Sequence, residues 1–288
     1  MDEDLGSVEV NGKTFEVKEV VGYSSLDISN IEITSVSEIQ GLESLTDLFH
    51  LNLSSNQLTD LTGLDVLPDL KTLHLNRNQI QDLSGLAKLT NLERLFLNEN
   101  QITDLSGLSS LTSLIWLDVS KNKISNISGL EPLTNLIHLE LGDNEIPEIS
   151  GFESLTNLEI LGLDRNQISD IKGLDKLTKL TSLKLERNKI TEIKGLEKLI
   201  NLNILKLAYN QITEISSLDN LTNLEDLDLG NNQLTGISGL DNLKKLKALY
   251  LGLNAFPQEA KKFEEFCLLG EENIQNLLKS YKEWEDSN

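Results

Sequence analysis

The stretch "LERLFLNENQITDLSGLSSLTS", residues 92–113, is one full unit of a pattern that repeats along most of the chain. The units follow one another without a slip, because one asparagine recurs every 22 residues: Asn56, Asn78, Asn100, Asn122, Asn144, Asn166, Asn188, Asn210, Asn232 and Asn254. A period this strict predicts a solenoid, since each unit can bury its apolar side only against its neighbours.

The chemistry of one unit predicts its local structure. The L-x-L segment alternates with period two, which indicates a short strand with leucines inward and the intervening side chains outward. The asparagine follows this strand, where the chain must turn. A glycine then precedes the second apolar segment and permits a tight turn into a 3₁₀ segment. Ser217 replaces this glycine once.

This pattern resembles the leucine-rich repeat family. The 22-residue length and the "NxIxxIxGLxxLxxL" second half are most similar to its SDS22-like class, which includes bacterial internalins and the phosphatase regulator that names the class. The resemblance implies an α/β solenoid, a right-handed horseshoe or arc. Its concave side would carry one parallel sheet and its convex side 3₁₀ or irregular segments. It also implies that each buried asparagine amide bonds the backbone of the adjoining coil, because a buried polar group needs a partner.

Both ends depart from the repeat, which predicts a cap at each end. Residues 1–25 form the first cap, because "VEVNGKTFEV" (8–17) alternates around Asn11-Gly12, a type I′ hairpin signal. Residues 26–254 hold one degenerate repeat, nine regular repeats and the start of a tenth. Residues 255–288 form a helical cap that begins near Pro257.

Two amphipathic stretches in that last segment predict two short helices, because their apolar residues are spaced by three and four. These residues are Phe263, Phe266, Cys267 and Leu269 in the first stretch, and Ile274, Leu277, Leu278, Tyr281 and Trp284 in the second.

The composition excludes several classes of partner. The net charge of −21 repels phosphate backbones and anionic lipid, so neither nucleic acid nor a membrane is expected. Cys267 is the single cysteine, so no internal disulfide can form. The acidic amino terminus has no long apolar run and does not read as a secretory signal. The expectation is a cytoplasmic monomer.

Catalytic motifs are missing from the sequence. It contains no phosphate-binding glycine loop, no G-x-S-x-G, no C-x-x-C and no H-E-x-x-H. Most acids occupy positions that the pattern places in solvent, so no enzyme and no cofactor are expected. His74 with Asp118 and Glu140, or His138 with Glu140, offers metal ligands. Parallel sheet positions do not converge on one ion, however, and no metal site is expected.

Positions in a unit are counted from the leucine that opens it, such as Leu92, so Arg94 is at position three and Phe96 at position five. The side chains at these two positions project from the concave face, and they are the candidate binding residues. Trp116 is among them, so it lies on open surface and is a candidate anchor for a partner. The alternative is that Trp116 merely covers the aliphatic atoms of its neighbours. Arg94, Trp116 and His138 are successive third positions, and the guanidinium is expected to stack on the indole. The partner-binding candidates are His50, His74, Arg94, Phe96, Trp116, Asp118, His138, Glu140, Lys184, Lys206, Asp226, Asp228 and Tyr250.

These features predict a non-catalytic scaffold that binds a folded protein on its concave face. Within the resemblance, a regulator of a signalling enzyme such as a Ser/Thr phosphatase is one possibility. An internalin-like surface adhesion module is an alternative. A regulatory repeat module associated with a GTPase, kinase or ligase is another.

Overall fold

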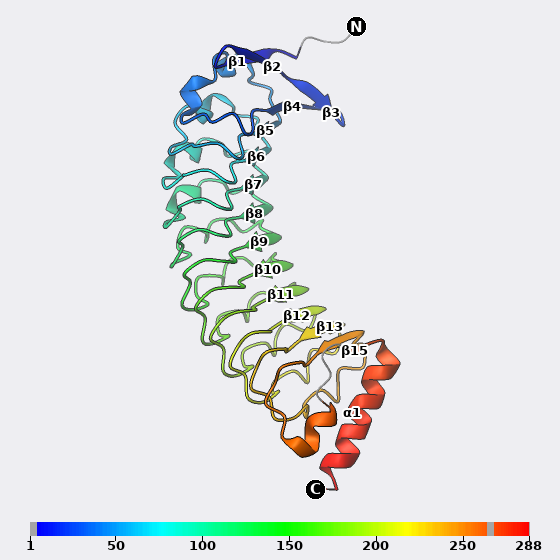
Figure 1. Ribbon diagram of the computed structural model, residues 1–288. Coiled ribbons are helices and arrows are strands. Elements are labelled where there is room, and N and C mark those ends of the chain that lie inside the picture. The colour runs from blue at the N-terminus through cyan, green and yellow to red at the C-terminus, as the bar shows by residue number, and fades with distance from the viewer. Residues whose placement is uncertain (1–4, 264–267, 288) are drawn as a thin grey trace. The chain divides into compact units, whose positions relative to one another are not determined.

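The computed structural model describes residues 5–263 and 268–287. The chain divides after Glu140 into two compact units, an amino-terminal unit and a carboxy-terminal unit. Each unit is a stack of coils in which every coil contributes one short strand to a sheet (Figure 1). The boundaries expected at residues 25 and 254 stay predictions.

The sheet of the amino-terminal unit runs in the order of the sequence from β3 to β9. Its strands are β3 (Lys18–Val20), β4 (Tyr23–Asp27), β5 (His50–Asn52), β6 (Thr72–His74), β7 (Arg94–Phe96), β8 (Trp116–Asp118) and β9 (His138–Glu140). The strands β4 to β9 are parallel, as the L-x-L pattern predicts. Leu51 pairs with Leu73, 22 residues later, but Leu26 pairs with Leu51, 25 residues later. The first coil is therefore longer than the others.

Two hairpins precede the regular coils. The strands β1 (Ser7–Val10) and β2 (Lys13–Glu16) are antiparallel, and φ is 52° at Asn11 and 71° at Gly12. Both values are positive, as a type I′ turn requires, so the predicted hairpin is confirmed. The hairpin of β3 and β4 was not predicted, because its turn begins with Val21, a β-branched residue at φ 54°. Such a residue rarely adopts a left-handed conformation.

The convex side differs between the units. The amino-terminal unit has five 3₁₀ helices: Val36–Glu38, Leu42–Ser44, Leu64–Val66, Ser84–Leu86 and Ser106–Leu108. Residues 141–257 form turns there instead. Gly173 illustrates the need for glycine in these turns. Its φ is 94°, and an added Cβ would lie 2.6 Å from the carbonyl oxygen of Ile149. Ser217, the one replacement, adopts the same left-handed region at φ 59°.

One buried or half-buried asparagine per regular coil joins that coil to its neighbours. The Nδ2 of Asn100 donates to the carbonyls of Leu75 (3.0 Å) and Leu97 (2.9 Å). Its Oδ1 accepts from the backbone N–H of Ile80 at 3.0 Å. The same pattern recurs at Asn188, so we call this column of side chains the asparagine ladder. The role that the resemblance implied for the asparagines is confirmed.

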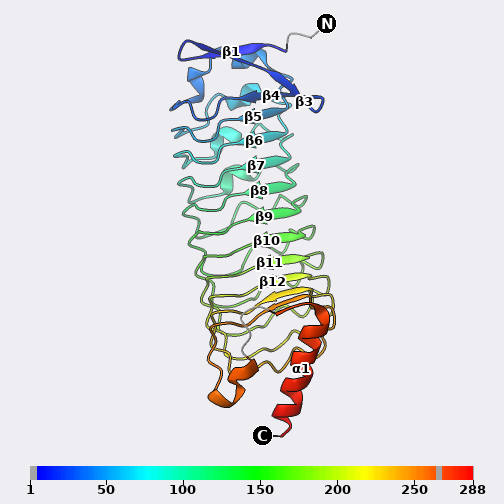
Figure 2. The same cartoon turned by 45° about the vertical axis from the view of Figure 1, so that its right-hand side comes forward.

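The carboxy-terminal unit has six strands in sequence order, five of them parallel. They are β10 (Ile160–Gly162), β11 (Ser182–Lys184), β12 (Ile204–Lys206), β13 (Asp226–Asp228), β14 (Ala248–Tyr250) and β15 (Leu268–Leu269), and β15 is antiparallel to β14. The helix α1 (Glu271–Glu285) follows β15 and contacts both β14 and β15 (Figure 2). Within the described residues, no helix is long and apolar enough to cross a membrane.

The predicted pair of carboxy-terminal helices needs a correction. The second stretch is α1, and Ile274, Leu278 and Tyr281 are buried on one side of it. The described residues of the first stretch are not α-helical. A 3₁₀ helix ends at Phe263, and Leu269 lies in β15, which pairs with backbone groups at the edge of β14 that would otherwise be open. Phe266 and Cys267 lie outside the described residues.

The asparagine ladder predicts a clear difference between two asparagine variants. Asn100→Ala should lower the free energy of unfolding by about 2 kcal/mol, because it leaves the buried N–H of Ile80 without a partner. It also removes one of the two amide donors at each of the carbonyls of Leu75 and Leu97, which Asn78 and Asn122 still contact. Asn91 is the matched control, since it is exposed and makes one bond to the carbonyl of Pro68. Asn91→Ala should cost less than about 0.5 kcal/mol. Urea denaturation measures both, and equal losses would contradict a structural role for the ladder.

Candidate functional site

Trp116 lies outside the core of the amino-terminal unit. Its side chain is 36% exposed, whereas Leu117, the next residue in β8, is fully buried. The alternation of a strand places these two side chains on opposite faces of the sheet. The sequence inference that Trp116 stands on the open face is therefore confirmed.

Aromatic rings gather on this face along the strands β4 to β9. The contacts connect neighbouring strands. Trp116 stacks on His138 with ring centroids 3.7 Å apart, and His74 stacks on Phe96 at 4.4 Å with planes 5° apart. Phe96 also lies 6.2 Å from Trp116 in a tilted contact. We call the set the aromatic ladder: Tyr23, Phe49, His50, His74, Phe96, Trp116 and His138.

Sequence reasoning missed two members of this ladder. Tyr23 stacks on Phe49 at 4.3 Å, and both rings meet His50 edge-on, at 5.9 and 4.8 Å. Phe49 occupies the position just before the strand, and Tyr23 belongs to the longer first coil. The neighbouring aromatic residues Phe49 and His50 in the sequence could have indicated this cluster. The prediction missed it because it considered only the third and fifth positions of each unit.

The expected stack of Arg94 on Trp116 is wrong. His138 and Phe96 contact the indole, and no cation–π contact joins Arg94 to it among the described residues. Phe96 is at the fifth position of β7, and its ring contacts Trp116 at the third position of β8. Arg94 is exposed.

The two acids predicted on this face have different local partners. Glu140 lies 2.9 Å from the Nε2 of His138, whose side chain is 12% exposed. The Nδ1 of His138 is buried and has no hydrogen-bond partner among the described residues. Asp118 accepts from the backbone N–H of Ser120 at 3.0 Å and from its hydroxyl at 2.6 Å. Asp118 therefore fixes its own turn.

Burial keeps two histidines of the ladder uncharged near neutral pH. It is the main cause that lowers the pKa of His74, and nearby His50 adds to it while Asp27 opposes it. Burial also lowers the pKa of His50, and the positive charge of Arg94 contributes. His50 and His74 thus contribute neutral imidazoles to the ladder at pH 7.

The face of the carboxy-terminal unit carries more charged side chains, together with Ile160 and Ile204. Lys206 pairs with Asp226 at 2.7 Å, and its Nζ lies 4.9 Å from the centre of the Tyr250 ring. Asp228 accepts from the backbone N–H of Gly230 at 3.0 Å. Lys184, the remaining candidate, is half-buried. The structure thus brings Lys206, Asp226 and Tyr250 together, and these charges largely neutralise one another.

Glu186 is the least satisfied acid on that face. Burial raises its pKa, and the negative charges of Asp164 and Asp228 add to this effect while Lys206 opposes it. Its Oε2 is buried without a hydrogen-bond partner among the described residues. Glu186 follows β11 by two residues, and the repeat pattern gives no sign of its burial.

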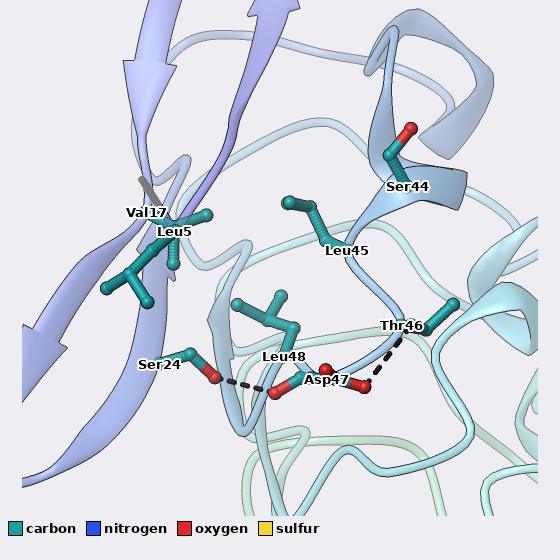
Figure 3. Close-up of a pocket in the computed structure, with 8 residues that line it drawn as sticks. All are labelled: Leu5, Val17, Ser24, Ser44, Leu45, Thr46, Asp47 and Leu48. Carbon is teal, nitrogen blue, oxygen red and sulfur yellow. Dashed lines mark hydrogen bonds between the residues drawn. The ribbon is translucent and has the colours of Figure 1, made fainter. Parts of the chain in front are cut away.

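A search for chemistry in the described residues yields no metal centre, because no group of three or more His, Cys, Asp or Glu side chains is placed to hold an ion. One pocket, of about 340 Å³, lies where the hairpin segments meet the first coil of the amino-terminal unit (Figure 3). Leu45 and Leu48 line it from the coil, and Val17 lines it from the hairpins. Asp47 is the single carboxylate among its lining residues, so they do not supply a paired acid and base.

The sequence profile of the family described as "Leucine Rich repeats (2 copies)" matches seven segments of the chain. They are residues 48–88, 90–132, 134–176, 156–198, 178–220, 200–242 and 222–259. The chain belongs to the leucine-rich repeat family. The SDS22-like subclass stays a prediction that the 22-residue repeat fits.

Solved structures of other leucine-rich repeat proteins resemble this chain. An internalin, InlF of Listeria monocytogenes, is 32% identical over 82% of each chain, with a TM-score of 0.55. Internalin C2 of the same organism is 35% identical over 73% of this chain and 80% of its own, with a TM-score of 0.52. A leucine-rich repeat protein of Leptospira interrogans is 29% identical over 82% of this chain and 60% of its own, with a TM-score of 0.73. No curated protein matches significantly.

The repeats and these relatives support a protein-interaction scaffold, and the family fold is typically non-catalytic. They do not point to one partner. The geometry adds that the stacked aromatic rings of the exposed strand face lie in the amino-terminal unit.

The lowered pKa of His74 predicts a pH-dependent contribution to stability. Because the unfolded chain binds this proton more readily, the stability associated with neutral His74 is complete above about pH 6.5 and declines as the pH falls below that value. His74→Phe keeps a ring beside Phe96 and removes the titration. Relative to this variant, the wild type should lose unfolding free energy between pH 7.5 and pH 5.5 in urea denaturation. A difference between the two proteins that stays constant with pH would contradict this reading.

Proposed function

We propose that this chain is a non-catalytic scaffold that binds a folded protein partner through the aromatic ladder. The observation that supports this most is the apolar surface around β8. Trp116 is 36% exposed, and Ile115 and Ile137, which directly precede β8 and β9, are each 38% exposed. Large apolar side chains gathered in water mark an interaction site, and tryptophan is among the residues most enriched as interface anchors.

The ladder is also suited to binding because its rings are already held in place. Trp116 and His138 restrain each other by stacking, as do His74 and Phe96. Fewer rotamers are then lost when a partner docks, which lowers the entropic cost of association. The leucines beneath these rings are fully buried and keep the strands in register.

Two biological settings fit such a scaffold. The internalin-like setting, in which the chain is a surface adhesion module, is supported by the 32% and 35% identity to two internalins. The other setting is regulation of a signalling enzyme such as a Ser/Thr phosphatase, which rests on the SDS22-like repeat pattern alone. We favour the internalin-like setting because of the sequence identity to the two internalins, and we keep regulation of a signalling enzyme as the alternative.

The two settings differ in cellular location. A regulator of a cytosolic enzyme requires the cytoplasmic location expected from the sequence, whereas an adhesion module requires exposure on the cell surface. Fractionation of source cells with an antibody against the chain separates the two. In both settings the proposal expects a monomer that binds its partner as a single chain.

Trp116→Ala tests the proposed anchor. Binding of the partner purified with the wild type should weaken by about 2 kcal/mol or more, as expected for an anchor. The loss of unfolding free energy should stay within about 1 kcal/mol, because the ring contributes stacking but no core packing. Calorimetric titration and thermal melting measure the two quantities.

Ile200→Ala is the matched control, because Ile200 is 53% exposed and lies outside the strands of either face. It should change neither partner binding nor stability. A large stability loss in Trp116→Ala with partner binding intact would mean that Trp116 is structural and that the partner binds elsewhere.

A further inference from the structure

Arg94 is an unpaired cation in the middle of the aromatic ladder. It is the one lysine or arginine at the third and fifth positions of β5 to β9, and it is exposed. Among the described residues its guanidinium has no ion pair and no hydrogen-bond partner. This is notable in a chain with 46 acidic and 25 basic residues, where acceptors are plentiful.

Other cations of the amino-terminal unit show that pairing is readily achieved there. Lys71 lies 2.9 Å from Glu93, and Lys121 and Arg77 lie 3.1 and 3.3 Å from Glu99. These pairs stand at the edges of the face, just before and just after the strands. Arg94 differs because its immediate surroundings on the face are uncharged.

The neighbours of Arg94 are given by the strand register. It pairs with Thr72 on one side and with Trp116 on the other. Phe96 follows two residues later on the same face of β7. Arg94 also acts on His50, whose pKa its positive charge helps to lower. The guanidinium thus stands among aromatic rings and a hydroxyl.

The acids within reach of the ladder have partners of their own. Asp118 accepts two hydrogen bonds from Ser120, Glu140 pairs with His138, and Glu93 pairs with Lys71. None of these three acids forms an ion pair with Arg94 in the part of the chain that the structure describes. A carboxylate supplied from outside would meet a planar fork of donors that suits bidentate pairing.

We propose that Arg94 recognises a carboxylate of the partner, and that the docking segment of the partner is acidic with an apolar side chain that packs on Trp116. This inference rests on the proposed function and names the chemistry of the partner. The aromatic ladder also favours a hydrogen-bond acceptor in the partner. Stacked rings cover their electron-rich faces and expose their positively polarised edges.

A carboxylate fits better than a phosphate group. A phosphate carries close to two negative charges at pH 7, and Asp27, Asp118 and Glu140 occupy the same face. The net charge of −21 further opposes a polyanion. A single carboxylate uses the guanidinium fork with less repulsion from these acids.

The test uses the full chain carrying Trp284→Phe, so that Trp116 is the single tryptophan and reports on binding by its fluorescence. The probes are four blocked tripeptides with a central phenylalanine and flanking glutamate, glutamine, lysine or phosphoserine. The glutamate peptide should bind about tenfold more tightly than the glutamine peptide, the expected worth of one charge-assisted pair. Arg94→Gln should abolish this preference, whereas Arg77→Gln, the matched control at the paired edge, should keep it.

The outcomes separate this inference from the proposed function. Equal binding of the glutamate, glutamine and lysine peptides, with binding lost in Trp116→Ala when it is measured by calorimetric titration, would overturn the carboxylate and leave the ladder as the binding surface. Tighter binding of the phosphoserine peptide would overturn the choice of anion. If the glutamate peptide leaves Trp116 fluorescence unchanged up to its solubility limit, the inference is overturned as well. The proposed function is then tested separately by whether Trp116→Ala still binds the partner purified with the wild type.

Discussion

Each coil of this chain is tied to its neighbours by the amide of one buried asparagine. The Nδ2 of Asn188 donates to a carbonyl of the preceding coil and to one of its own, and its Oδ1 accepts from a backbone N–H. In the regular coils the equal length places these groups in line with those of the next coil, and buried polar atoms left without partners are costly. This constraint explains why the asparagines keep a spacing of 22 residues without a slip. The leucines that surround them then have fixed places in the core.

Because the asparagines and leucines hold the coils together, the residues on the exposed face of the sheet can vary. Positions four and six of each coil are committed to the core, as Leu95 and Leu97 are, whereas positions three and five lie outside the leucine core. Some fifth positions also hold the turn that follows the strand, as Asp118 does. The two units use that freedom differently. The amino-terminal unit presents stacked rings around Trp116, and the carboxy-terminal unit presents paired charges such as Lys206 and Asp226. A protein-binding scaffold follows from this separation, because the contact surface can vary while the frame stays constant.

The sequence predicts the frame well because periodicity reports directly on burial. The strands, the Asn11-Gly12 hairpin and the exposure of Trp116 all follow from the repeat or from local turn chemistry. The side-chain contacts on the exposed face do not follow from the repeat, because the rotamer of each side chain determines which of several neighbours it contacts. Phe96 and His138 contact Trp116, and Arg94 does not. The β3–β4 hairpin was also hidden, since Val21 is not a usual turn residue, and β15 forms only because β14 offers an open edge.

The separation of frame and face is the central claim, and a saturation substitution of β5 to β9 tests it most directly. Every residue at positions three, five, four, six and nine of these coils would be varied, and the folded fraction measured by resistance to protease. The account predicts that most substitutions at positions three and five leave the protein folded, while polar substitutions at four and six and any substitution of the asparagine at nine do not. Equal sensitivity at all five positions would contradict it, because the aromatic ladder would then be part of the core and not a free surface.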